Sequence, residues 1–211
     1  MPKNEIGKLN REKIFKAALA MLDEHGLDNL SMRKLGVKLG VKAMSLYNYV
    51  ENKESLFDGI VDLIIKEMST PKATNDWKAD LHGVAYSFHT VLIQHPNALP
   101  LIATRPIKTQ VGLEKVEYML SILNRGKISG IKALYTLHVL VSFITGYAFL
   151  EVGTAKGEVK LNTYTSVEKM KTSIDLKQFP CIFELLHDMP LYNSKEEFDY
   201  GLELIFKSLN I

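Results

Sequence analysis

Residues 42–49 carry side chains that could recognise a polar ligand, because they combine an amine, a hydroxyl, an amide and two phenols. All of these groups donate or accept hydrogen bonds. The sequence shows no glycine-rich phosphate loop, nucleophile elbow or paired catalytic carboxylates. The chemistry that this segment suggests is therefore recognition rather than catalysis.

The residues just before this segment predict two short helices joined by a tight turn. Ser31 is a suitable N-cap, because its hydroxyl can accept from a backbone N–H one turn later. Leu30 and Leu35 stand at the spacing of a hydrophobic staple. Gly40 falls where the first helix must end in a left-handed residue.

The second short helix begins near Lys42 and divides its residues between two faces. Leu46 and Val50 are four residues apart and can face inward. This pattern is typical of a helix-turn-helix whose second helix enters the DNA major groove. The remaining side chains face outward, and they are Lys42, Ala43, Met44, Ser45, Tyr47, Asn48 and Tyr49.

Helices are predicted along the rest of the chain, and no alternating strand pattern competes with them. Apolar spacing and cap residues, among them Asn10, Asn52 and Asp76, place them near 11–25, 53–69, 77–94, 96–103, 111–125, 129–152, 179–189 and 195–209. The last is expected to open on a capping box at Ser194–Glu197. A long loop is expected over 153–178. The fold class is therefore all-α.

The best domain boundary is the polar segment 70–76. It separates a predicted helix-turn-helix domain at 1–69 from a larger helical domain at 77–211. Residues 1–53 hold ten Lys or Arg against six Asp or Glu, whereas the whole chain of 211 residues has a net charge of only +2. A phosphate backbone would attract the N-terminal part.

Bulk properties favour a soluble cytoplasmic protein without a membrane contact. Hydrophobic residues make up 46% of the chain, and we expect no apolar run as long as a membrane span. The single Cys181 suits a reducing compartment, and the N-terminus has no apolar signal core.

Metal binding and cofactors are not expected. His82 and His89 share a helix face, and Glu184 and His187 have a ligand-like spacing, but a di-iron bundle needs two such Glu-x-x-His motifs and two further carboxylates. These histidines are better explained as satisfied or exposed side chains.

The N-terminal part resembles the DNA-binding domain of the tetracycline-repressor (TetR) family of transcriptional regulators. The most specific match is Leu-Tyr-x-x-Val-x-x-Lys at 46–53, preceded by Arg33–Val37 and Leu39–Val41. Residues 77–211 are similar to the C-terminal domain of the subgroup around the tetracycline repressor, through His95-Pro96, Arg105-Pro106, 146–151 and 198–202. In such proteins this domain dimerises and holds a small effector.

The sequence departs from the family pattern in three places. Gly36 stands where most members have alanine, at a position that packs against the recognition helix. The recognition helix has no arginine, so a bidentate contact with guanine from an arginine fork is not evident. No residues match the metal-assisted tetracycline site.

The resemblance implies specific DNA contacts. Ser31, Lys53 and Tyr47 would bind phosphates, and Arg33 would reach backbone or base. Ala43 and Met44 would touch thymine methyl groups, while Ser45 and Asn48 would meet base edges. The full set is Ser31, Arg33, Lys42, Ala43, Met44, Ser45, Tyr47, Asn48, Tyr49 and Lys53.

An effector cavity is also implied by the resemblance. Its candidate lining residues are Tyr86, His89, Met119, His138, Phe143 and Tyr147, although aromatic and Met residues at helical spacing are more often plain core.

The sequence thus predicts a homodimeric repressor that a small molecule releases from a palindromic operator, paired through the helices near 129–152 and 195–209. An activator or effector-independent regulator of the same family stays open. So do an enzyme on a helical scaffold and a helical interaction module without DNA binding.

Overall fold

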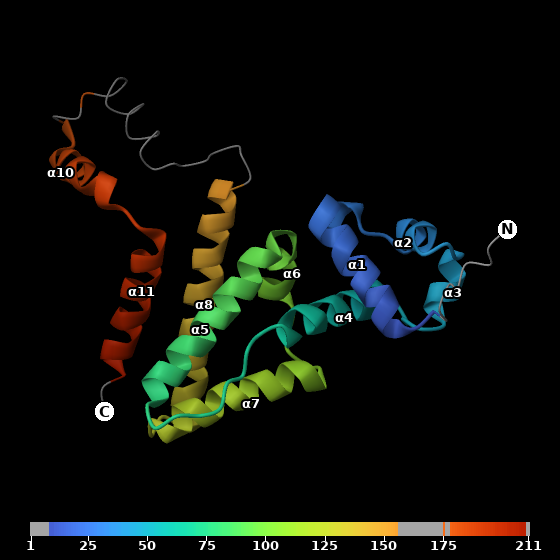
Figure 1. The fold of residues 1–211 in the computed structure, drawn as a ribbon, viewed down its shortest axis with the longest axis horizontal. Helices are drawn as coiled ribbons and strands as arrows, with labels where there is room; N and C mark the ends of the chain where they lie inside the picture. Colours follow the sequence, from blue (N-terminus) through green and yellow to red (C-terminus); the bar gives the residue numbers. More distant parts are fainter. Residues whose placement is uncertain (1–8, 156–174, 176–177, 210–211) are drawn as a thin grey trace. The chain divides into compact units, whose positions relative to one another are not determined.

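The structure is a computed structural model, which describes residues 9–155, 175 and 178–209. In these residues the regular elements are α-helices and short 3₁₀ turns, with no strand, so the all-α prediction is confirmed (Figure 1). The elements are Arg11–His25 (α1), Leu27–Asn29 (η1), Met32–Lys38 (α2), Ala43–Tyr47 (α3), Lys53–Lys66 (α4), Trp77–Gln94 (α5), Pro96–Ala98 (η2), Leu99–Thr104 (α6), Gln110–Arg125 (α7), Gly130–Ala155 (α8), Pro180–Asp188 (α10), Met189–Leu191 (η4) and Ser194–Ser208 (α11).

Side-chain caps start three helices, α1, α4 and α5, at the residues that the sequence indicates. Asn10 accepts a hydrogen bond from the Lys13 amide at 2.9 Å, and Asn52 accepts one from the Ser55 amide at 2.8 Å. Asp76 accepts from two amides of α5, both at 3.0 Å. Each cap satisfies amides that a helix start leaves unpaired.

The start of α11 differs from the predicted capping box. Asn193, rather than Ser194, is the N-cap and accepts from the amides of Lys195 and Glu196. Glu197 instead accepts a hydrogen bond from the Tyr192 hydroxyl at 2.7 Å. Asparagine caps a helix as well as serine does, and here it stands one residue earlier.

The long helix α8 extends three residues beyond its predicted end, to Ala155. The loop expected at 153–178 otherwise falls almost wholly outside the described residues. In the described part of the chain, Gly130–Gly153 is one helix long and apolar enough to cross a membrane, with a mean hydropathy of 1.6. The expectation that no apolar run reaches that length is therefore wrong. A helix buried between subunits has the same composition.

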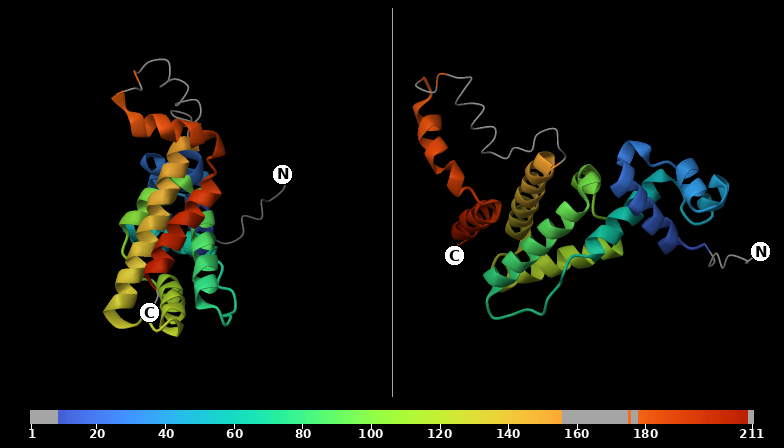
Figure 2. Two further views of the ribbon diagram at one scale, coloured as in Figure 1. Left: turned by 90° about the vertical axis from the view of Figure 1, so that its left-hand side faces the viewer. Right: turned by 45° about the horizontal axis from the view of Figure 1, so that its top comes forward.

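The chain forms two compact units, 1–137 and 138–211. In the first, α4 contacts α1 and also α5, α6 and α7 (Figures 1 and 2). Its fully buried side chains include Ile14 of α1 and Leu56 and Ile60 of α4. In the second unit, an aromatic cluster joins α8 to α11, with the Phe143 and Phe198 rings stacked at 5.5 Å. Helix α4, together with the contact between α1 and η2, therefore links the N-terminal helices to the rest of the first unit.

Candidate nucleic-acid interface

The short helix α3 is fixed by apolar contacts on its inner side. Leu46 of α3 and Val50 just after it have no exposed surface, and neither has Leu35 of α2. The turn between the helices is closed by Gly40, whose φ of +68° is the left-handed conformation that the sequence predicts. The local pattern of Leu30–Val50 thus folds as a helix-turn-helix.

Gly36 allows α2 and the turn to approach closely. A Cβ built at Gly36 would lie 2.8 Å from the Val41 carbonyl oxygen and 3.2 Å from the Ala43 amide nitrogen. The Val41 amide donates a hydrogen bond to the Gly36 carbonyl at 2.9 Å. Both obstacles are backbone atoms, which cannot rotate away, so even alanine would strain this contact.

The outer side of α3 presents side chains that are partly or largely open to solvent. Met44 is 74% exposed and Tyr47 is 45% exposed. Lys42 and Asn48 are also exposed, whereas Ala43, Ser45 and Tyr49 are half-buried. Among the described residues, no hydrogen bond or ion pair engages the side chains of residues 42–49. These donors and acceptors are available to an external ligand.

Ser31, Arg33 and Lys53 lie at helix starts beside this surface. The Ser31 hydroxyl accepts from the Lys34 amide at 3.2 Å, which leaves its own O–H able to donate. Arg33 and Lys53 are exposed. The Lys53 ammonium lies over the Phe57 ring, 5.2 Å from the ring centre. The structure therefore places these three predicted residues on helices that flank α3.

A row of acidic side chains on α4 meets basic and hydroxyl groups from residues 105–109, and sequence analysis missed this contact. Glu54, Asp58 and Asp62 recur every four residues along one helix face. Arg105 pairs with Glu54 at 2.7 Å and with Asp58 through Nε at 2.8 Å. Lys108 pairs with Asp58 at 3.0 Å, and the Thr109 hydroxyl donates to Asp62. We call these contacts the α4 seam.

Charges in the α4 seam stabilise one another. Burial opposes ionisation of Asp58, but hydrogen bonds from Lys108 and Arg105 outweigh it and hold the pKa of this carboxyl below its ordinary value. Burial likewise opposes the charge of Arg105, yet the hydrogen bonds to Glu54 and Asp58 raise the pKa of the guanidinium. Both groups therefore stay charged at neutral pH.

His95 and Asn97 extend the polar contacts to α1. The His95 ring nitrogens lie 3.0 Å from an Asp23 oxygen and 3.2 Å from a Glu67 oxygen. The Asn97 amide donates to the Asp23 carbonyl at 2.8 Å. The C-terminal ends of α1 and α4 are therefore tied to the η2 region.

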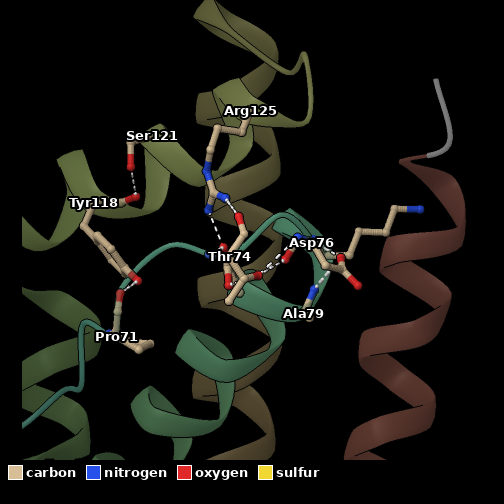
Figure 3. A network of polar contacts seen from close by, with 9 residues as sticks. Pro71, Thr74, Asp76, Ala79, Tyr118, Ser121 and Arg125 are labelled. Carbon is tan, nitrogen blue, oxygen red and sulfur yellow. Dashed lines mark hydrogen bonds and ion pairs between the residues drawn. The ribbon is translucent and has the colours of Figure 1, made fainter.

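The polar segment 68–76, which we call the strap, is bonded along its length to α5 and α7. Tyr118 donates to the Pro71 carbonyl, and Arg125 donates to the Thr74 carbonyl, both at 2.6 Å (Figure 3). Lys115 donates to the Met68 carbonyl at 2.6 Å. The predicted boundary segment 70–76 lies within the strap, and its Pro71 and Thr74 carbonyls accept hydrogen bonds from α7.

Asp80 is the buried centre of the strap contacts. Its side chain is 4% exposed, pairs with Arg125, and accepts from the hydroxyl and amide of Thr74 at 2.8 and 2.9 Å. The hydrogen bond from Arg125 is the main cause that lowers the pKa of this carboxyl, against the effect of burial. This carboxylate stabilises the strap only while it is ionised.

The candidate effector residues lie in both units. Tyr86 and His89 are on α5 and Met119 is on α7, and of these His89 is buried at 9% exposure. His138, Phe143 and Tyr147 are on α8, where His138 is exposed. Phe143 and Tyr147 pack against Phe198, with ring centres 5.5 and 5.2 Å away. These two rings therefore pack against α11 within the second unit.

The Tyr147 hydroxyl is already engaged within its own unit. It donates to the Ser194 carbonyl and lies 3.2 Å from a Glu197 oxygen. Burial and the nearby Glu197 charge raise the pKa of this phenol well above its ordinary value. Tyr147 is therefore a neutral hydrogen-bonding group.

Two further features bear on ligands. A surface groove of about 620 Å³ lies among α1, η1 and α2, and it is lined by Met21, His25, Asn29, Lys34, Val37 and Lys38. None of the candidate effector residues lines it. Within the described ranges, no group of three or more His, Cys, Asp or Glu side chains could hold a metal ion.

Comparison with known proteins identifies the class to which this fold and surface belong. Residues 14–60 match the family described as bacterial regulatory proteins, tetR family. Residues 70–210 match the tetracyclin repressor-like, C-terminal domain. The chain belongs to the tetR family, and it is a DNA-binding transcriptional regulator of the kind that responds to small-molecule ligands.

Individual relatives agree over nearly the whole chain. Tetracycline repressor protein class D of Escherichia coli is 28% identical over 98% of this chain and 91% of that protein. The HTH-type transcriptional repressor DrrR1 of Streptomyces coeruleorubidus is 23% identical over 96% of this chain and 78% of that protein. The solved structure of ActR of Streptomyces coelicolor, in complex with actinorhodin, superposes with a TM-score of 0.85 and 25% identity, covering 96% of each chain.

Proposed function

We propose that this chain represses transcription as a homodimer, by placing residues 42–49 of each subunit in the major groove of a palindromic operator. The observation that carries the proposal is the outer face of α3, where Met44 is 74% exposed and Tyr47 is 45% exposed while Leu46 is fully buried. A short helix that is anchored on one side and uncovered on the other suits insertion into a groove.

The proposed contacts follow the chemistry of each side chain. Ser31, Tyr47 and Lys53 bind phosphates, and Arg33 reaches backbone or base. Ala43 and Met44 meet thymine methyl groups, and Lys42, Ser45, Asn48 and Tyr49 complete the reading face. These residues form a domain at 1–69, and residues 77–211 form the effector-binding and dimerisation domain.

We propose that dimerisation uses α8 and α11. Both helices have exposed apolar side chains, including Tyr135 and Val139 on α8 and Tyr200 and Leu204 on α11. Burial of such side chains between two subunits would supply the driving force for pairing. Two-fold symmetry of the pair then requires two operator half-sites.

Release from DNA would follow binding of an apolar small molecule in the domain at 77–211. Tyr86, His89, Met119, His138, Phe143 and Tyr147 are the proposed lining residues. The effector acts only through its higher affinity for the state that does not bind DNA. A solved relative, ActR of Streptomyces coelicolor, is in complex with actinorhodin, which supports a ligand-responsive role for this chain. The chain would act in the cytoplasm by binding and not by catalysis.

DNA binding is tested with a duplex selected from a random-sequence pool by the full-length protein. We expect the logarithm of the binding constant to fall steeply with the logarithm of salt concentration. Tyr47→Ala should weaken binding by about 1–3 kcal/mol, and Lys53→Ala should reduce the salt slope by about 1.

The matched control is Lys72→Ala, an exposed lysine outside the helix-turn-helix and outside the proposed dimerisation helices. It should leave the dissociation constant for the selected duplex unchanged. A slope near zero for the wild type would refute the proposal and favour a helical interaction module without a DNA role. Reporter expression with the selected duplex upstream separates a repressor from an activator.

A further inference from the structure

One guanidinium, that of Arg105, makes several polar contacts with the N-terminal half of α4. Arg105 follows α6 in the chain, and its side chain is only 12% exposed. Its Nη1 donates to the Glu54 carboxylate at 2.7 Å, and its Nη2 donates to the Glu54 carbonyl at 3.0 Å. Nε donates to Asp58 at 2.8 Å, so all three guanidinium nitrogens are used. Lysine could not replace this planar fork with its single ammonium.

The same guanidinium also contacts the ring that supports Lys53. The Arg105 Cζ lies 5.6 Å from the centre of the Phe57 ring, and the Lys53 ammonium lies 5.2 Å from it. Phe57 is 8% exposed. Arg105 therefore contacts residues 54, 57 and 58, which surround Lys53 on the first turns of α4.

Helix α4 begins only six residues after α3 ends. Between them, Val50 is fully buried and Asn52 caps α4 through the Ser55 amide. This short connection has little freedom, so a shift of the first turn of α4 changes the position of Lys53 relative to α3. Small displacements of binding groups cost affinity, because a duplex presents its phosphates at fixed spacing.

We propose that Arg105 is a positioning residue for operator binding, which fixes Lys53 relative to the recognition helix by clamping Glu54, Phe57 and Asp58. The inference rests on the proposed operator contact of Lys53. It assigns a role in DNA binding to a residue outside the helix-turn-helix.

Substitution of the acidic partners separates positioning from simple charge. Glu54 and Asp58 are negative groups next to a proposed phosphate contact, so their removal should strengthen DNA binding if only charge matters. The clamp requires the opposite result. We expect Asp58→Ala and Glu54→Ala each to weaken binding to the selected duplex, by about three- to tenfold, and Arg105→Met by about tenfold.

Matched variants complete the test. Lys108→Met removes a positive charge that pairs with the Asp58 carboxylate, but it leaves the Arg105 contacts in place. It should change the dissociation constant by no more than about twofold. Arg105→Lys keeps the charge without the fork and should fall between the wild type and Arg105→Met.

Binding is measured by fluorescence anisotropy with the full-length chain, and folding is checked by circular dichroism and Tm. Should Arg105→Met fail to fold, Glu54→Ala decides the question, because that side chain is 67% exposed and its loss leaves the core intact. Tighter or unchanged binding by Glu54→Ala and Asp58→Ala overturns the inference. Equal effects of Arg105→Met and Lys108→Met would also overturn it.

A failure of the proposed function would give a different result from a failure of the Arg105 inference. In the first case the wild type binds no selected duplex with a steep salt dependence. If the wild type binds and Tyr47→Ala does not, while the Asp58 and Glu54 variants bind more tightly, then only the role of Arg105 is wrong.

Discussion

Two neighbouring helices of the first unit are held by different forces. Helix α3 is fixed by shape, through the buried Leu46 and the backbone approach at Gly36. Helix α4 is fixed on one side by charge, through Arg105, Lys108 and Thr109. The reading helix keeps its polar groups uncommitted to other described residues, whereas the supporting helix uses its carboxylates internally. The first arrangement suits recognition and the second suits positioning.

We expect the largest loss of stability from substitutions at Gly36, where α2 and the turn approach closely. Gly36→Leu forces a side chain against the Val41 carbonyl and the Ala43 amide, so we expect a loss of about 3 kcal/mol in the free energy of unfolding. Gly36→Ala should lose less, because its single methyl group meets the same atoms at 2.8 and 3.2 Å. Urea unfolding measures both.

Gly83→Ala on α5 is the matched control. A Cβ at Gly83 would meet nothing within 4 Å, so alanine should stabilise the protein by about 0.5–1 kcal/mol through its helix propensity. A Gly36→Leu protein as stable as the wild type would contradict the close approach of α2 and the turn.

Charge-based contacts should respond to acid. Arg125 lowers the pKa of Asp80 in the folded protein, and hydrogen bonds from Lys108 and Arg105 lower that of Asp58 against burial. The stability that each carboxylate contributes is therefore present above its unfolded-state pKa, near 3.8, and is lost as the pH falls through the folded value. We expect the Tm of the wild type to fall as the pH drops below about 4.

Asp80→Asn should lower Tm at pH 7, because neutral asparagine cannot form the ion pair with Arg125. It should also flatten the acid dependence of Tm, because asparagine does not titrate. The corresponding Tm–pH curve of the Gly36→Ala variant should run parallel to that of the wild type. Asp80→Asn with an unchanged acid dependence would show that the strap does not depend on this charge.

Thr109 offers a smaller, local test of the α4 seam. Its hydroxyl donates to Asp62 and accepts from the Gly112 amide at 3.2 Å, which caps α7. Thr109→Val should cost about 1–2 kcal/mol, because it removes the cap and leaves Asp62 without this donor. Thr109→Ser should restore most of that loss in the same unfolding measurement.

The smallest effect is expected at Lys108, where the ammonium is 55% exposed. Solvent screens such a pair, so Lys108→Met should change the free energy of unfolding by less than about 1 kcal/mol. A larger loss would mean that Lys108 contributes to the stability of the α4 seam as much as Arg105 does.

Local chemistry made most of the fold predictable. Ser31, Asn52 and Asp76 cap the helices that their positions indicate, and Gly40 closes the turn in the expected conformation. The extent of α5, Trp77–Gln94, also matches its prediction. The error at α11 arose because Asn193 and Ser194 are both good caps, and the residues after them do not distinguish the two.

Long-range contacts were harder to predict. The spacing of Glu54, Asp58 and Asp62 showed an acidic face, but a solvated helix has the same pattern. Only the packing of α7 and of residues 105–109 on α4 reveals that this face is covered. Phe143 and Tyr147 likewise fitted a cavity or a core, and only the structure shows that both rings pack against Phe198 of α11.

The sequence by itself determined the helices, their caps and the outward face of α3, because those depend on interactions between residues at most a few positions apart. Tertiary structure decided which carboxylates are paired and how the strap is fastened. These features join residues about 45 to 70 positions apart, such as Asp80 with Arg125 and Asp23 with His95. No local pattern encodes such pairings, since they form only when separate helices pack together.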